Sequence, residues 1–523
     1  VVANTYNYTR GLLTKVVCNN NEYKFEYDGF GRQTKTTVNG TDVVENEYYD
    51  QSQYNSAFED TFNYSKITYN IGNGKSYSEK TIYNKSGAPI SLQRDGTMAA
   101  ELLRISYDDY DRVEYMYDKA MGASKITTCH YTYKDDGELD KVTMTGYRTG
   151  ELQDTCDRSG RQIGKRVKFG EEKNYTFGYE KDGNNTVPGN RLVSVGLPTG
   201  KEVTYDYDSL GRFKKRSIAT SGHALTETYS YLKSNYNPNI CQNDRTTEFV
   251  STVQYGGYNY SANAFYTYDK RGNISEVVDN GKTYRYQYDG LDRLVREDNQ
   301  YMNFTKVYEY DANGNIVKIT KYDYTTAETL SGGQVTSYSY DTGAHKDRLV
   351  KITYSDGRVE NFSSYDFLGN PCSYRGIVIE WERGRQMARY RDVQYSYDVS
   401  GIRQEKQVGS LLHKYYTDGG RIYKEERGND TLWYHYDNTG ITGIEYNGIA
   451  YYFQKNLQGD VVRIYDGNGN LKAQYFYDAW GNHRICDEFG ADITEDVITP
   501  EMSFTFATHI GRVNPFRYRG YYY

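Results

Sequence analysis

A short motif recurs twelve times in the 523 residues: tyrosine, aspartate or asparagine, two variable residues, then glycine or aspartate. Repetition of this kind is typical of architectures in which one structural unit is copied along the chain. The copies begin at Tyr27, Tyr83, Tyr107, Tyr207, Tyr268, Tyr288, Tyr310, Tyr365, Tyr397, Tyr436, Tyr465 and Tyr477. The repetition indicates that most residues build a scaffold.

A strand pattern precedes the turn of each motif. Tyr284, Tyr286 and Tyr288 alternate with Arg285 and Gln287, which is the period-two pattern of a strand with one aromatic face. We expect the tyrosines of such strands to share one face of a sheet and the polar residues to share the other.

A turn pattern follows the strand. After Tyr310, Asp311 and Gly314 occupy the positions expected in a type I turn that is closed by a left-handed residue. Asp111 and Asp292 replace the glycine in two copies, and aspartate tolerates that conformation better than most residues. Each repeat is therefore predicted to be a β-hairpin. We single out these structural turn residues: Tyr27, Asp28, Gly31, Tyr207, Asp208, Gly211, Tyr268, Asp269, Gly272, Tyr310, Asp311, Gly314, Tyr477, Asp478 and Gly481.

The spacing between copies is irregular. It is 20 residues from Tyr268 to Tyr288 and 22 from Tyr288 to Tyr310, but 61 from Tyr207 to Tyr268. This favours an all-β fold made of one continuous, meandering antiparallel sheet over a tightly stepped solenoid. Helical periodicity is scarce, and residues 98–103 are the best candidate for a short helix.

Composition supports a thin-walled β structure. Tyrosine supplies 61 of the 523 residues and proline only 7. Tyrosine favours strands and offers a large apolar body with a polar tip, so tyrosine rows can stabilise a sheet without a thick aliphatic core. A disordered low-complexity chain is the alternative, but 25% charged residues spread through the strands argue against it.

Several classes of function are disfavoured. The net charge is −7 and no basic block stands out, which argues against nucleic-acid binding. No apolar run approaches the roughly 18 residues of a membrane span. The first residues show no secretion-signal pattern, and the chain opens in the middle of the repeat rhythm, so we expect it to be a fragment of a longer protein.

No catalytic or metal site is evident. The six cysteines are scattered singly, which fits neither a zinc site nor a dense disulfide framework. The loops 311–315 and 466–470 resemble calcium loops but lack the glycine and glutamate that an EF-hand requires. The histidines show no metal-ligand spacing. We therefore predict no catalytic residue, no metal and no cofactor.

The repeats resemble those of the RHS/YD-repeat family. The strongest copies are residues 27–32, 207–212, 268–273 and 310–315. The C-terminal segments 451–460, 475–482 and 514–523 resemble the start of the family's RHS-associated core. We call residues 514–523 the core motif; the residues that carry this resemblance are Pro515, Phe516, Arg517, Tyr518, Arg519 and Gly520.

The resemblance implies a sheet strip that spirals into a hollow shell. In bacterial polymorphic toxins and the C component of toxin complexes, such a shell encloses a variable C-terminal toxic domain, which an aspartate-dependent self-cleavage in the core frees. It implies a repeat shell over residues 1–450, and the last repeats with the start of the core over 451–523. The cleavage residues would lie beyond Tyr523, so no catalytic residue is carried over, and we expect an open or frayed C-terminal end.

Three functions follow as alternatives. The first is a non-enzymatic shell, secreted or at the bacterial cell surface, whose partners are its own downstream toxin domain and a delivery or capping protein. The second is a surface repeat protein that binds glycans or other cells, as in eukaryotic relatives with YD shells. The third is a self-processing enzyme.

Overall fold

The computed structural model describes residues 2–7, 11–18, 21–49, 63–72, 74–94, 100–181, 188–233, 246–258, 260–343, 347–362, 364–494 and 508–523. Nearly all regular structure is antiparallel β-strand, arranged in two sheets of 29 and 13 strands. Within these ranges, no helix is long and apolar enough to span a membrane.

The first sheet, here the strip, contains β1 to β29. Its strands are β1 Val2–Asn7, β2 Leu12–Cys18, β3 Asn21–Tyr27, β4 Gln33–Val38, β5 Thr41–Tyr49, β6 Tyr64–Gly72, β7 Lys75–Tyr83, β8 Pro89–Arg94, β9 Glu101–Tyr107, β10 Val113–Asp118, β11 Thr127–Tyr133, β12 Leu139–Gly146, β13 Gly150–Cys156, β14 Gln162–Phe169, β15 Glu171–Lys181, β16 Pro188–Gly196, β17 Glu202–Tyr207, β18 Phe213–Ile218, β19 Leu225–Lys233, β20 Thr246–Gly256, β21 Ser261–Tyr268, β22 Ile274–Asp279, β23 Lys282–Tyr288, β24 Leu294–Asn299, β25 Phe304–Tyr310, β26 Ile316–Asp323, β27 Gln334–Tyr340, β28 Leu349–Thr353 and β29 Val359–Asn361.

The second sheet, here the inner sheet, contains β30 to β42. Its strands are β30 Ser373–Tyr374, β31 Ile377–Glu382, β32 Gln386–Tyr390, β33 Val393–Tyr397, β34 Arg403–Val408, β35 Leu411–Asp418, β36 Arg421–Arg427, β37 Asp430–Asp437, β38 Gly440–Tyr446, β39 Ile449–Lys455, β40 Val461–Asp466, β41 Leu471–Tyr477 and β42 His483–Asp487. Two short helical turns follow, α2 Ile510–Val513 and η3 Tyr518–Gly520.

Every strand pairs with its neighbours in sequence, so each sheet is an uninterrupted meander. In a meander, every second turn lies at the same end of the strands. The motif turns of the strip therefore share one end, as do those after Tyr397, Tyr436 and Tyr477 in the inner sheet. The turn after Tyr465 connects β40 to β41 and lies at the opposite end of the strands.

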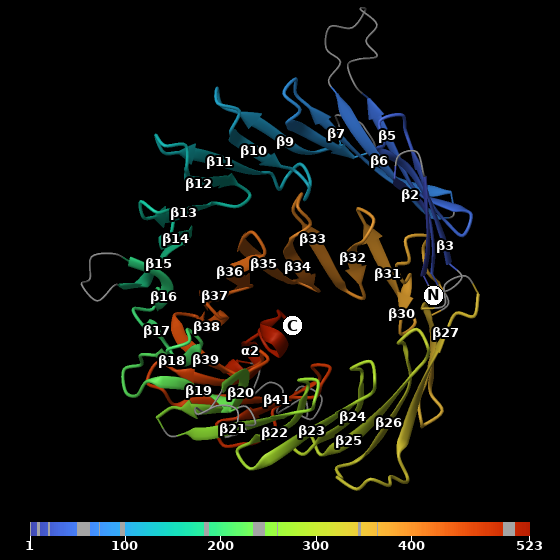
Figure 1. The fold of residues 1–523 in the computed structure, drawn as a ribbon. Helices are drawn as coiled ribbons and strands as arrows, with labels where there is room; N and C mark the ends of the chain where they lie inside the picture. Colours follow the sequence, from blue (N-terminus) through green and yellow to red (C-terminus); the bar gives the residue numbers. More distant parts are fainter. Residues whose placement is uncertain are drawn as a thin grey trace, which may run out of the picture.

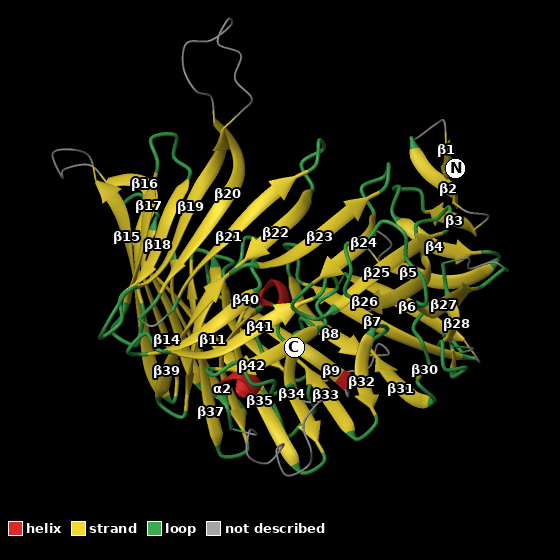
Figure 2. Ribbon diagram, turned by 90° about the horizontal axis from the view of Figure 1, so that it is seen from below, coloured by secondary structure: helices red, strands yellow, loops and turns green. Residues whose placement is uncertain are grey.

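The chain turns through a full circle (Figure 1). The strip curves round, and the inner sheet lies within the curve with the C-terminus near the middle. The circle closes where the backbone N–H of Phe367 donates to the carbonyl of Ile71 at 3.4 Å, and where the Arg383 guanidinium pairs with Glu79 at 2.8 Å. Figure 2 shows the same molecule from below, with strands making up almost the entire wall.

The strip and the inner sheet share a core. On β17, Val203 and Tyr205 are buried while Glu202 and Thr204 are exposed, as period-two alternation requires. Inward-facing strip residues pack against Trp433 and other residues of the inner sheet in one hydrophobic cluster. The inward face is therefore held by apolar burial, while the outward face is polar.

The predicted tyrosine face on β23 is observed. Tyr284, Tyr286 and Tyr288 point inward, and Arg285 and Gln287 are exposed on the outer face. The short helix expected over residues 98–103 is wrong for residues 101–103, because Glu101–Tyr107 forms β9 and pairs with β8 and β10. Met98 and Ala99 lie outside the described residues. Sheet pairing on both sides outweighs the weak local preference for helix. The division at 450/451 falls within the β38–β39 hairpin, and it stays a prediction.

The aspartate of each motif organises its turn. In the turn 311–315, the Gly314 N–H donates to the Asp311 carbonyl at 3.2 Å, and the Asp311 carboxylate accepts from the backbone N–H groups of Asn313 and Asn315. Gly314 has φ 92°, and Asp111 and Asp292 take φ 58° and 61° at the same position. The same carboxylate-to-backbone bonds recur at Asp28, Asp108, Asp208, Asp269, Asp289 and Asp478.

Replacing Gly314 by valine is expected to lower the free energy of unfolding by about 1–2 kcal/mol, because β-branched residues resist the left-handed region. A Cβ at Gly314 would meet nothing within 4 Å, so backbone strain is the only cost. Gly290→Val is the matched control, because that site is equally open and its φ lies outside the left-handed region. Chemical denaturation measures both variants, and equal losses would contradict the assigned turn.

The tyrosine of each motif ties its repeat to the preceding one. The Tyr310 hydroxyl donates at 2.7 Å to the carbonyl of Leu294, the first residue after the preceding turn. The guanidinium of Arg293, at the end of that turn, lies 4.6 Å from the centre of the Tyr310 ring. Equivalent hydroxyl bonds to backbone carbonyls are made by the motif tyrosines Tyr27, Tyr107, Tyr207, Tyr268, Tyr288, Tyr365, Tyr397, Tyr436 and Tyr477. Tyr465 differs, because its hydroxyl donates to the Gln454 side chain.

Tyr310→Phe is expected to cost about 1 kcal/mol, because it removes one hydroxyl bond and leaves the Leu294 carbonyl without that donor. Tyr284→Phe is the control, since the Tyr284 hydroxyl makes no hydrogen bond with the described residues. The measurement is the free energy of unfolding in urea. If both variants lose the same stability, the hydroxyl does not couple the repeats.

Candidate functional site

The core motif is ordered and packs into the inner sheet. The backbone carbonyl of Arg517 accepts a hydrogen bond from the Val461 N–H at 3.0 Å. Phe516 and Tyr522 form an isolated antiparallel β-bridge. Phe516 is buried in a cluster with residues of β37 to β42. The expectation of a frayed C-terminal end is therefore wrong. Apolar burial and a backbone bridge fix this segment, and both arise from contacts that its local sequence does not reveal.

A buried carboxylate anchors the end of the motif. Glu425 accepts hydrogen bonds from Tyr522 at 3.0 Å, from Tyr434 at 2.5 Å, from His413 at 2.9 Å and from Arg427 at 2.6 Å. Burial alone would raise the pKa of Glu425, but the bonds from His413 and Arg427 outweigh it and lower the pKa to about 2. The carboxylate is therefore charged and fully paired.

A second buried charge cluster joins the strip to the inner sheet. Arg216 of β18 pairs with Asp437 of β37 at 2.7 Å and with Glu227 of β19 at 3.2 Å, and it also donates to Thr442. The Arg216 and Glu227 side chains are each 2% exposed and that of Asp437 is 0% exposed. The backbone N–H of Lys455 donates to Glu227, so residues of five strands meet at this cluster.

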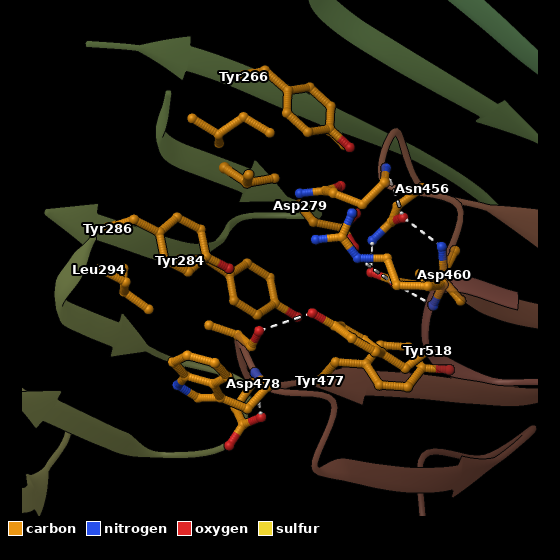
Figure 3. Close-up of a pocket in the computed structure, with 18 of the residues that line it drawn as sticks. Tyr266, Asp279, Tyr284, Tyr286, Leu294, Asn456, Asp460, Tyr477, Asp478 and Tyr518 are labelled. Atoms are coloured by element: carbon orange, nitrogen blue, oxygen red, sulfur yellow. Dashed lines mark hydrogen bonds and ion pairs between the residues drawn. The ribbon is translucent and has the colours of Figure 1, made fainter. Parts of the chain in front are cut away.

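A cavity of about 470 Å³ lies between the strip and the end of the inner sheet (Figure 3). Tyr266, Tyr284 and Tyr286 approach it from the strip, and Tyr477 and Tyr518 approach it from the C-terminal side. The remaining lining residues are Tyr255, Ala264, Gly272, Asn273, Ile274, Val277, Asp279, Tyr288, Leu294, Asn456, Gln458, Asp460, Val462, Tyr475, Asp478, Ala479, Trp480 and Arg519.

Asp460 is a buried carboxylate on the C-terminal side of this cavity. It accepts from the backbone N–H of Arg519 at 2.7 Å and from the Asn456 side chain at 2.6 Å, and it is 5% exposed. Burial raises the pKa of Asp460 despite these two bonds. The Arg519 guanidinium lies 4.0 Å away and is 47% exposed, so it compensates the charge only weakly.

Two more carboxylates, Glu297 and Asp478, lie close together at the cavity, and Asp478 is one of its lining residues. Glu297 of β24 accepts from the Ala479 N–H at 3.1 Å and from the Tyr308 hydroxyl at 3.2 Å. Asp478 pairs with Lys306 at 2.7 Å. Burial, and then the charge of Asp478, raise the pKa of Glu297 to about 7.

The cavity brings together some of the residues that the sequence singles out. Gly272, Tyr477, Asp478, Tyr518 and Arg519 line it. The Tyr518 hydroxyl donates to the Ala479 carbonyl at 2.8 Å. The other singled-out residues are distributed as follows: Tyr27, Asp28, Gly31, Tyr207, Asp208, Gly211, Tyr310, Asp311 and Gly314 lie along the strip, Tyr268 and Asp269 form the turn that includes Gly272, Gly481 packs against Tyr518, and Pro515, Phe516, Arg517 and Gly520 lie in the core motif.

Sequence analysis missed one turn of this site. Residues 456–460 form a turn in which Asn456 takes the place of the motif aspartate, and the Gly459 N–H donates to its carbonyl at 3.0 Å. The Tyr477 hydroxyl then donates to Val461, as in the other repeats. The signal was the asparagine followed by glycine at the motif spacing, but Lys455 replaces the tyrosine that identifies the other copies.

Neither metal ligands nor disulfides are assembled in the described ranges. No group of three or more histidine, cysteine, aspartate or glutamate side chains there could hold a metal ion. Cys18, Cys129, Cys156, Cys372 and Cys486 are free thiols. Cys241 lies outside the described residues.

Comparison with known proteins identifies the repeat. A sequence model of the RHS Repeat matches residues 268–299, which include β23 and its flanking turns. The tRNA3(Ser)-specific nuclease WapA of Bacillus spizizenii is 27% identical over 189 residues, covering 31% of this chain and 8% of the nuclease. Teneurin-1 of Mus musculus is 23% identical over 335 residues, covering 60% of this chain and 11% of teneurin. The chain thus matches only about a tenth of either relative's length.

Two solved structures match the chain at low identity. The crystal structure of TcdB2-TccC3 without the hypervariable C-terminal region gives a TM-score of 0.42 at 13% identity, covering 98% of this chain and 28% of that chain. The crystal structure of TcdB2-TccC3-TEV gives a TM-score of 0.40 at 12% identity, covering 96% and 31%.

Proposed function

Since this chain is an RHS/YD-repeat protein, we propose that it is the wall of a non-enzymatic shell that encloses a toxic domain encoded downstream of Tyr523. The observation that carries the proposal is the closed circle. The chain that follows the strip returns to β6 and β7, where Phe367 contacts Ile71 and Arg383 contacts Glu79, and the inner sheet lies inside the curve. A wall of this kind separates an interior from solvent.

The sheet chemistry supports containment. The turns, hydroxyl bonds and arginine stacking tie each hairpin to the next, so the wall is continuous along the chain. The buried cluster at Arg216 fastens the inner sheet to the wall. We assign residues 1–450 to the repeat wall and 451–523 to its last repeats and the start of the core. The partners are the enclosed domain and a delivery or capping protein, and the setting is secretion or the bacterial cell surface.

A surface role in binding glycans or other cells is the second candidate. The motif turns of the strip expose large apolar side chains. Among them are Phe30, Tyr110, Leu210 and Leu291, which are between 67% and 79% exposed. Isolated exposed apolar residues are common on proteins, however, and these turns are separated by polar ones. The shell is therefore the better supported function.

Limited proteolysis of the longer parent protein tests the shell. We expect the segment after Tyr523 to resist protease when it is attached to the intact repeats. Arg216→Met, which loosens the inner sheet, should make that segment cleavable, whereas Arg285→Met on the outer face should leave it protected. Equal digestion of the segment in all three proteins would refute enclosure.

Mass spectrometry of residues 1–523 tests the non-enzymatic part of the proposal. We expect one intact chain of 60.5 kDa after prolonged incubation. General acid–base or nucleophilic chemistry needs groups held within hydrogen-bond reach of each other and of a reacting group. Spontaneous cleavage at one defined site would place a catalytic centre within these residues.

A further inference from the structure

We propose that the cavity between the strip and the inner sheet binds an organic cation, an alkylammonium group held against tyrosine rings beside the Asp460 carboxylate. This binding function is separate from enclosure and does not depend on it. The cavity has a volume of about 470 Å³. Pockets for small molecules typically measure a few hundred to a thousand Å³ and combine aromatic walls with a few polar groups.

The walls supply aromatic rings from two directions. Tyr284 and Tyr286 approach from β23, and Tyr477 approaches from β41 (Figure 3). Trp480 also lines the cavity, in the turn at its C-terminal side, and is 53% exposed. Organic cations are attracted to the negative faces of such rings, and aromatic cages are a known means of recognising quaternary ammonium groups.

The rings of Tyr284 and Tyr286 pack against a hydrophobic cluster of the strip, but the fold does not use their hydroxyls. Tyr288 and Tyr477 donate their hydroxyls to backbone carbonyls as part of the repeat. By contrast, the Tyr284 and Tyr286 hydroxyls make no hydrogen bond with the described residues, although both rings point into the cavity. The hairpin alternation fixes their direction, but it does not explain why tyrosine rather than phenylalanine occupies both positions.

The charges favour a cation over a neutral or anionic ligand. Of the three carboxylates in the lining, Asp279 is paired with Arg463 at 3.2 Å and Asp478 with Lys306 at 2.7 Å. Asp460 has a weaker partner: Arg519, which also lines the cavity, holds its guanidinium 4.0 Å away and is 47% exposed. A cation near Asp460 would gain attraction in a site of reduced solvation.

Part of the polar lining is not open to a sugar, although the Tyr284 and Tyr286 hydroxyls are. Asn456 already donates its amide N–H to Asp460, and its side-chain oxygen accepts from the N–H groups of Gln458 and Asp460. A sugar needs several open donors and acceptors around its ring, and the Asn456 amide is already occupied. A saccharide is therefore a competing outcome of the test.

Isothermal titration calorimetry of the 523-residue protein with choline chloride tests the proposal. The uncharged isostere 3,3-dimethylbutan-1-ol has the same shape, so it isolates the contribution of charge. We expect choline to bind at least ten-fold more tightly than the alcohol. Equal binding of the two compounds, no binding of choline, or binding of maltose in its place would overturn the proposal.

Variants separate the two recognition elements. Tyr286→Leu removes a ring and Asp460→Asn removes a charge, and each should weaken choline binding at least ten-fold. Tyr286→Phe keeps the ring and should retain binding to within about three-fold. Tyr110→Leu, in an exposed turn of the strip, is the control for a lost aromatic ring. Circular dichroism checks that each variant is folded. If folded Tyr286→Leu and Asp460→Asn proteins bind choline as the parent does, the cavity is not the site.

Discussion

Arg216→Met is expected to lower the free energy of unfolding by about 3–5 kcal/mol, because it leaves buried carboxylates without their cation. Arg216 contacts both Asp437 and Glu227, and all three side chains are at most 2% exposed. The Asp437 pKa is lowered to about 2 because the charges of Arg216 and Lys455 outweigh the effect of burial. Without Arg216, this carboxylate must either stay charged in a dry site or take up a proton.

Urea denaturation followed by tyrosine and tryptophan fluorescence measures this loss. Arg285→Met is the matched control, because that guanidinium pairs with Glu276 on the outer face and is 48% exposed. Exposed ion pairs contribute roughly 0–1 kcal/mol, so the control should lose little. If the two variants lose similar stability, the Arg216 cluster does not fasten the inner sheet to the strip.

Glu297 is expected to make the protein less stable as the pH rises from about 5 to 8. Its pKa is about 7 in the folded protein and 4.5 when unperturbed. Between these values the folded state keeps a proton that the unfolded state has released, so the free energy of unfolding falls as pH rises. A difference of this size corresponds to about 3 kcal/mol. Glu425 and Asp437 have pKa values of about 2 and titrate below this window.

Glu297→Gln removes this pH dependence. Its carbonyl can still accept from Asn299 and Ala479, and its amide can donate to the Tyr308 hydroxyl. The variant should match the parent near pH 5 and exceed its stability at pH 8. Melting temperatures at intervals between pH 5 and 8 provide the test. A parent protein and variant with parallel pH profiles would show that Glu297 is ionised throughout.

The hairpins were predictable because their information is local. Asp311 and Gly314 define a turn within five residues, and the alternation of Tyr284 to Tyr288 defines a strand face. The same reasoning failed at Glu101, Leu102 and Leu103. Their apolar spacing resembles a helix turn, but Glu101–Tyr107 is held between two neighbouring strands. Pairing on both sides decides the outcome there, and local spacing does not contain that information.

The cavity was not predictable, although several of its residues were. Tyr477 and Gly272 stand out as repeat residues. Nothing in the sequence indicates that these two residues, which are 205 positions apart, line the same cavity. The partnership of Arg216 with Asp437 spans 221 residues. Such contacts depend on the curvature of the whole strip, which accumulates from small twists between strands. Sequence spacing specifies each hairpin, but it does not specify the curvature that the hairpins produce together.

The uninterrupted meander has a consequence for how the protein is made. Each strand finds its partner in the hairpin that has just been synthesised, so the sheet can grow from the N-terminus while the ribosome is still translating. The contacts that close the circle, such as Arg383 with Glu79, can form only after some 300 further residues have emerged. Until then, the last completed strand is an exposed edge, which is a site for wrong pairing between nascent chains. Slower elongation leaves that edge exposed for longer before the circle closes, so the rate of elongation would affect the yield of correctly wound molecules.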